Sequence, residues 1–208
     1  MLLRLLTALI IASAVFLVIF LKNFWLFFAV ILLVCLAAYY EWLSNAFKNK
    51  LFGFFLIFNF GFWSIYWISD QFLAYIFYGI FILNTAVFDT FAYVVGSNFG
   101  KNYIAKKISP NKTLEGLIGG LFSSALLGFL VILYDGSISN VFILVLIVGG
   151  ISAFFGDLLI SYYKRQAGVK DTGTILPGHG GILDRIDSHL VATPVIIIMW
   201  YFLEYFQL

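Results

Sequence analysis

Long apolar runs separated by isolated charges make up most of the chain. The runs from Arg4 to Lys22 and from Lys22 to Glu41 hold 17 and 18 uncharged residues, and similar runs follow in the second half. A helix needs about 17–25 mainly apolar residues to cross a bilayer. The pattern therefore predicts an all-α polytopic membrane protein with about seven transmembrane helices. The predicted spans are residues 3–21, 24–43, 51–69, 71–97, 114–134, 138–163 and 182–206.

The composition agrees with this pattern. Of the 208 residues, 63% are hydrophobic and only 11% are charged, and the mean hydropathy is +1.04. An ordinary soluble domain is about a quarter charged, so this chain has too few charges to cover a water-facing surface. A soluble globular enzyme, a disordered chain and a basic nucleic-acid binder are excluded, and we expect no nucleic-acid partner. The single cysteine, Cys35, excludes an intramolecular disulfide.

Lysines and arginines are distributed unevenly among the predicted loops. With the N-terminus placed in the cytoplasm, 11 of the 12 basic residues lie on the cytoplasmic side and only Lys22 lies on the other. A bias of this size sets the orientation of a membrane protein. We therefore predict a cytoplasmic N-terminus.

Two segments on the predicted cytoplasmic side, 89–120 and 156–188, hold 14 of the 22 charged residues. Asp89 lies 18 residues after the start of its span, about 27 Å along a helix and close to the cytoplasmic side of a ~30 Å core. Asp157 reaches the same depth on another helix, and Asp184 and Asp187 begin the last one. Carboxylates at this depth are costly unless they are paired or bind a cation. Hard oxygen ligands favour Mg²⁺.

Simpler roles compete with metal binding for some of these acids. A cap or an interhelical hydrogen bond explains Asp89 about as well. Favourable charge at a helix N-terminus explains one of Asp184 and Asp187. Neither role explains the matching Asp157, so metal binding is favoured for Asp157 and Asp184, with Asp187 as a third candidate ligand.

Basic residues alternate with these acids along the second segment; they are Lys164, Arg165, Lys170 and Arg185. Acids that hold Mg²⁺ and bases that hold phosphate oxygens form the set that phosphoryl or nucleotidyl transfer requires. Gly180 and Gly181 belong to a glycine-rich turn whose amides could face an anion. His179 could be a general base, a phosphate donor or an ordinary loop histidine, and the last is favoured.

The segment from Ser161 to Asp187 carries the most specific pattern in the chain. It reads S-Y-Y-K-R, four residues, K-D, five residues, P-G-H-G-G-I-L-D-R-I-D. This pattern resembles the signature of the phosphatidate cytidylyltransferase family, also called CDP-diacylglycerol synthase. The upstream run from Asp89 to Gly120 is also similar to that family, so the resemblance covers roughly residues 85–190.

The resemblance implies transfer of the cytidylyl group of CTP to phosphatidic acid of the cytoplasmic leaflet, with Mg²⁺, in a multi-pass plasma-membrane enzyme. Asp157 and Asp184 fall on the metal-binding carboxylates of the family. Catalytic roles are expected for Lys164, Arg165, Lys170, Asp171 and Arg185. Substrate contacts are expected from Asp89, Lys101, Lys112, His179, Gly180 and Gly181. Whether a second, monovalent cation binds and whether the protein forms a homodimer are left open by the sequence.

Two other functions are weighed against this one. A CTP-dependent kinase of a polyprenol or other lipid alcohol would need a base such as Asp89 or His179 for its neutral nucleophile. A non-enzymatic seven-helix transporter is disfavoured, because transporters tend to place their binding sites near the midplane. We accordingly divide the chain into N-terminal transmembrane helices, 1–70, which line a lipid-facing groove, and a catalytic region, 71–208, with cytoplasmic loops 98–115 and 164–182.

Overall fold

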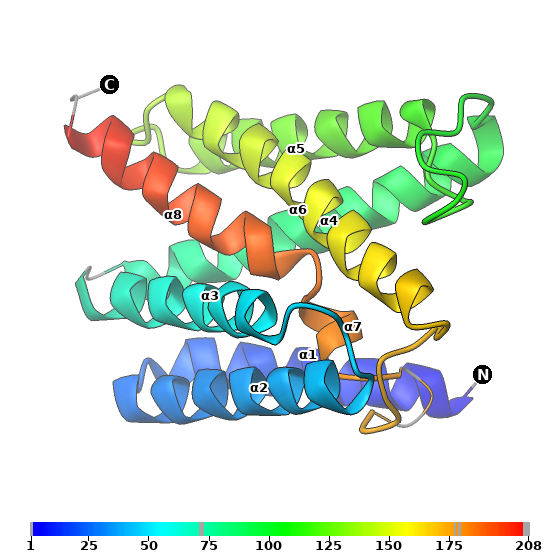
Figure 1. Cartoon of the computed structure of the whole chain (residues 1–208). Helices are drawn as coiled ribbons and strands as arrows, with labels where there is room; N and C mark the ends of the chain where they lie inside the picture. Colours follow the sequence, from blue (N-terminus) through cyan, green and yellow to red (C-terminus); the bar gives the residue numbers. More distant parts are fainter. Residues whose placement is uncertain (1, 71–72, 177, 179, 206–208) are drawn as a thin grey trace.

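The computed structural model describes residues 2–70, 73–176, 178 and 180–205, and this part of the chain consists of α-helices joined by loops, without a β-strand (Figure 1). The helices are α1 (Leu2–Leu21), α2 (Phe24–Ser44), α3 (Lys50–Asp70), α4 (Ala74–Phe99), α5 (Leu114–Tyr134), α6 (Val141–Gln166), α7 (Leu183–Ile186) and α8 (His189–Tyr205). Six spans in this part are long and apolar enough to cross a membrane, the last running from α7 into α8, and α1 adds a shorter apolar stretch, Leu6–Leu21. The prediction of about seven transmembrane helices is confirmed.

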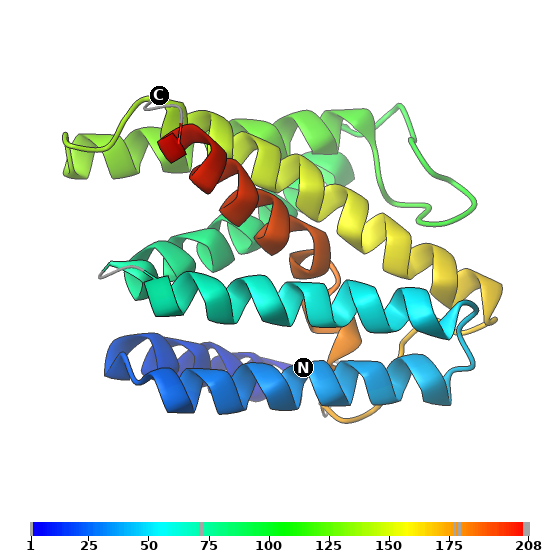
Figure 2. The ribbon, with the colours of Figure 1, turned by 60° about the vertical axis from the view of Figure 1, so that its left-hand side comes forward.

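Successive long helices run in opposite directions, so the loops fall into two groups. The α2–α3, α4–α5 and α6–α7 connections lie at one end of the bundle, and the α1–α2 and α5–α6 connections lie at the opposite end (Figure 1; Figure 2). Both segments rich in charge therefore meet at the same end of the molecule. We call this end the loop end.

Helices α4, α5 and α6 pack closely because small residues line their contacts. A Cβ added at Gly116 of α5 would lie 2.6 Å from the carbonyl oxygen of Ala92 on α4. One added at Gly120 would lie 2.7 Å from the ring of Phe88. Small residues allow backbones in membranes to approach each other in this way. A Cβ added at Gly150 of α6 would also lie 2.7 Å from the Phe88 ring, so the helix that carries Asp157 packs directly on the helix that carries Asp89.

The last predicted span, 182–206, is wrong as a single continuous helix. The structure interrupts it at Asp187 and Ser188, between α7 and α8. The Asp187 side chain accepts the backbone N–H of Ser188 at 2.9 Å, and such a local bond competes with the helical hydrogen-bond ladder. The interruption packs on Gly156 of α6, where an added Cβ would lie 2.5 Å from the Asp187 carbonyl oxygen.

We expect Gly156→Ala to destabilise the protein, because its methyl group would push α6 away from this interruption. Overpacking of this kind costs about 1–3 kcal/mol, and thermal unfolding in detergent would measure it. Gly136→Ala is the matched control, since a Cβ at Gly136 meets no atom within 4 Å. Equal unfolding temperatures for the two variants would contradict the close contact.

Candidate active site

A pocket of about 330 Å³ lies on the loop-end side of the bundle, where α4, α5 and α6 meet the α7–α8 interruption. Its described lining includes the carboxylates of Asp89, Asp157, Asp184 and Asp187 together with Lys112. Asp89 precedes the end of α4 by ten residues and Asp157 precedes the end of α6 by nine, which places both roughly 14 Å inside the helix ends. The carboxylates that the sequence placed at one depth therefore do line one pocket.

Asp157 and Lys112 form an ion pair in the wall of this pocket. The Lys112 Nζ lies 2.7 Å from Asp157 Oδ2 and 4.4 Å from the centre of the Phe154 ring. The Ser161 hydroxyl donates to Asp157 Oδ1 at 3.1 Å. The two charged side chains are 15% and 29% exposed, so the pair is open to a ligand that enters the pocket.

Asp89 and Asp187 are joined through Ser188. The Ser188 hydroxyl donates to Asp89 Oδ2 at 3.0 Å, and its backbone N–H donates to Asp187 Oδ1. Asp89 is thus hydrogen-bonded to the interruption between α7 and α8, and it also lines the pocket. Asp187 lines the same pocket as Asp157 and Asp89, so the three carboxylates repel one another when all are ionised. This concentration of negative charge favours a bound cation.

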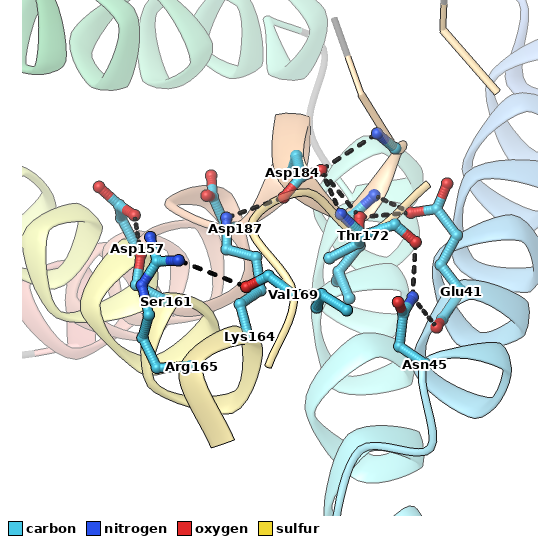
Figure 3. Close-up of polar contacts among 12 residues, drawn as sticks. Glu41, Asn45, Asp157, Ser161, Lys164, Arg165, Val169, Thr172, Asp184 and Asp187 are labelled. Carbon is cyan, nitrogen blue, oxygen red and sulfur yellow. Dashed lines mark hydrogen bonds and ion pairs between the residues drawn. The ribbon is translucent and has the colours of Figure 1, made fainter. Parts of the chain in front are cut away.

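Asp184 lies in the same wall but is occupied by protein donors. Its Oδ1 pairs with Lys164 Nζ at 2.8 Å. Its Oδ2 accepts the backbone N–H of Thr172 at 2.7 Å, the Thr172 hydroxyl at 3.0 Å and the Gly181 N–H at 3.1 Å. Asp184 therefore ties the α6–α7 loop to the beginning of α7 (Figure 3).

Glu41, which no sequence pattern indicated as a site residue, lies in the last turns of α2 and is only 1% exposed. Its Oε1 accepts the N–H of Ile182, and its Oε2 accepts the N–H of Leu183 and the hydroxyl of Thr172, each at 2.9 Å. Glu41 and Asp184 lie on either side of Thr172 (Figure 3). The one signal for Glu41 in the sequence is that it is a lone carboxylate near the end of an apolar span, and such a residue equally well marks the boundary of the span.

Several residues with predicted catalytic or substrate-binding roles lie outside the pocket lining. The exposed ones are Lys101, Arg165, Lys170, Asp171 and Arg185. Arg165 bridges the two charged loops, donating to the Ile108 carbonyl at 3.1 Å and to the Val169 carbonyl at 3.3 Å. Lys164 is buried with Asp184 rather than exposed to solvent.

The glycine-rich turn is only partly described. Gly180 has a left-handed φ of +84°, which an L side chain rarely adopts. Gly181 is buried where a Cβ would overlap Glu41 and Thr172. His179 lies outside the described residues, so its predicted contacts stay a prediction.

The donor set of the pocket fits Mg²⁺. In the described part of the chain, no three His, Cys, Asp or Glu side chains gather into a ready-made metal cage. Mg²⁺, however, commonly uses one or two carboxylates and completes its shell with waters and substrate phosphates. Asp157 and Asp187 face one pocket from neighbouring elements. The Asp157 side chain has one partner on each oxygen and is 29% exposed, whereas the Asp184 side chain accepts from four protein donors and is only 4% exposed. The metal itself and the assignment of Asp184 as a ligand stay predictions.

The chain is similar in sequence to known proteins of one family. Residues 44–205 match the model of the cytidylyltransferase family. A phosphatidate cytidylyltransferase of Staphylococcus aureus (strain COL) is 43% identical over 141 residues. Proteins of the same name from Staphylococcus haemolyticus and Staphylococcus epidermidis are 41% and 40% identical. The aligned part makes up 67% of this chain and 54% of each relative, so the chain spans about half the length of the curated relatives it matches.

Proposed function

Because this chain belongs to the cytidylyltransferase family, we propose that it transfers the cytidylyl group of CTP to phosphatidic acid, forming CDP-diacylglycerol and pyrophosphate. The observation that carries the proposal is the pocket that carboxylates from three parts of the chain line together with Lys112. Such a pocket suits a substrate that brings several phosphates and a cation together. The Staphylococcus relatives carry the name of this activity.

The proposed reaction is a displacement at phosphorus. An oxygen of the lipid phosphate attacks the α-phosphorus of CTP, and a new P–O bond forms. The bond from the α-phosphorus to the oxygen that bridges to the β-phosphate breaks, and pyrophosphate leaves with the electron pair. Since the attacking oxygen is already anionic, this step needs no general base. The protein has to position two anionic substrates and balance their charge.

We assign the pocket residues to these tasks by their position. Asp157 and Asp187 would hold Mg²⁺, which when bound neutralises charge on the triphosphate. Lys112 would turn from Asp157 to the phosphate oxygens, since its ammonium group is partly exposed in the pocket wall. The exposed basic residues of the loop end, Lys101, Arg165, Lys170 and Arg185, would attract CTP before it enters. A second cation and a homodimer stay predictions.

The decisive experiment uses purified protein, labelled CTP and vesicles that contain phosphatidic acid, with Mg²⁺ or with a chelator. We expect label from the cytidine to appear in the lipid only when Mg²⁺ is present. Release of CDP with a lipid alcohol as acceptor would instead support the kinase, for which Asp89 is the described candidate base. Neither product, under conditions where the protein stays folded, would overturn the proposed function.

We also propose that the loop end faces the cytoplasm, as the distribution of basic residues indicates. In intact cells, a membrane-impermeant maleimide should label Ser137→Cys, in the α5–α6 loop at the opposite end, and should not label Lys106→Cys at the loop end. Both variants should be labelled after the cells are permeabilised. Labelling of Lys106→Cys alone in intact cells would reverse the orientation.

A further inference from the structure

We propose that Glu41 is a positioning residue that sets the place of α7, and with it Asp187, from the N-terminal part of the chain. Glu41 lies on α2, 131 residues before Thr172 and 142 before Leu183, yet it accepts hydrogen bonds from both. The proposal rests on the nucleotidyl transfer proposed above, because it assigns a role within that same site.

The contacts of Glu41 leave its carboxylate little freedom. Both oxygens accept backbone N–H groups at the beginning of α7, from Ile182 and Leu183. The turn closes tightly around the side chain, because a Cβ at Gly173 would lie 2.7 Å from Glu41 Oε1. Four residues beyond Leu183, at the other end of α7, stands the pocket residue Asp187. A shift at the first turn of so short a helix is therefore passed on to Asp187.

Thr172 connects Glu41 to the opposite wall of the site. Its one hydroxyl lies 2.9 Å from Glu41 Oε2 and 3.0 Å from Asp184 Oδ2, and Asp184 continues to Lys164 of α6. Asn45 is the residue that follows α2, and its side-chain amide donates a further hydrogen bond to the Thr172 carbonyl at 2.5 Å. The base of the α6–α7 loop is thereby clamped between α2 and α6. The N-terminal part of the chain therefore also holds the α6–α7 loop in place, through Glu41 and Asn45.

The test compares Glu41→Gln and Glu41→Ala with Glu204→Gln, the same chemical change at an exposed carboxylate of the opposite end. A misplaced reacting group costs as much as about a hundredfold in rate. We expect both Glu41 variants to lower kcat by at least about tenfold and to raise the Mg²⁺ concentration needed for half-maximal activity. A smaller folded fraction alone would lower the apparent kcat without moving that concentration.

Amide hydrogen exchange provides a readout that needs no activity. Peptides that cover residues 172–183 should exchange about tenfold faster in the Glu41 variants, as expected for the loss of buried hydrogen bonds. Peptides from the α4–α5 loop, 100–113, serve as the internal reference and should be unchanged. If the Glu41 variants fail to fold, Thr172→Val, which removes only the bridging hydroxyl, should show a smaller change in the same direction.

The outcomes separate the two proposals. Faster exchange in both peptide groups would show that Glu41 merely stabilises the whole fold, and unchanged exchange would show that it holds nothing in place; either result overturns the positioning role. If the unmodified protein forms no cytidylyl lipid, the proposed function fails. The exchange measurement then still decides whether Glu41 positions α7.

Discussion

Asp157→Asn and Asp187→Asn should each reduce cytidylyl transfer by about a thousandfold while the protein stays folded. Losing a carboxylate ligand to a hard cation costs several kcal/mol of transition-state stabilisation, and each 1.4 kcal/mol is about a factor of ten in rate. Asp157 is 29% exposed and its pair with Lys112 is open to the pocket, so the change should affect stability little. Initial rates with labelled CTP at saturating Mg²⁺ would measure the loss.

The control for both variants is Asp135→Asn, at the exposed C-terminal end of α5 on the opposite side of the bundle. It removes one negative charge without touching the pocket and should keep near-normal rates. A rate for Asp157→Asn or Asp187→Asn that matches this control would remove that residue from the site.

The transmembrane spans could be predicted from the sequence because the bilayer sets the length of each apolar run. The span 114–134 coincides with α5, whose first turn is fixed by Thr113: its hydroxyl accepts the Gly116 N–H at 3.1 Å. The interruption after α7 was not predictable in this way. It depends on how Asp187 and Ser188 pack on Gly156, which lies in another helix.

For the pocket, too, some features could be predicted from the sequence and others could not. Counting residues along the helices placed Asp89 and Asp157 at one depth, and the structure brings them to one wall. Counting residues along a helix gives the depth of a charged side chain but not its partner. The sequence therefore indicates Lys164 as a phosphate ligand, whereas the structure pairs it with Asp184. Glu41 was missed because its partners lie more than 130 residues away along the chain. No local pattern reports contacts at that separation.

Lys164→Met should destabilise the protein by about 3–5 kcal/mol, the usual cost of removing one partner of a buried ion pair. Methionine has a similar length and no charge, so the change isolates the loss of the ammonium group. Lys164 and Asp184 have side chains only 11% and 4% exposed. Asp184 would be left buried and negatively charged, held only by the N–H groups of Thr172 and Gly181 and the Thr172 hydroxyl. Denaturant unfolding in detergent micelles would measure the loss against Lys48→Met, at an exposed lysine of the same end.

The double variant Lys164→Met/Asp184→Asn distinguishes a structural pair from a phosphate ligand. Removing the second charge eliminates the unpaired carboxylate, so the double variant should be more stable than Lys164→Met alone, a departure from additivity expected of residues in contact. If Lys164 served only the triphosphate, Lys164→Met would keep its stability, lose activity, and gain nothing from Asp184→Asn. That result would make the ion pair incidental and return Lys164 to the group of phosphate-binding residues that its place in the sequence first indicated.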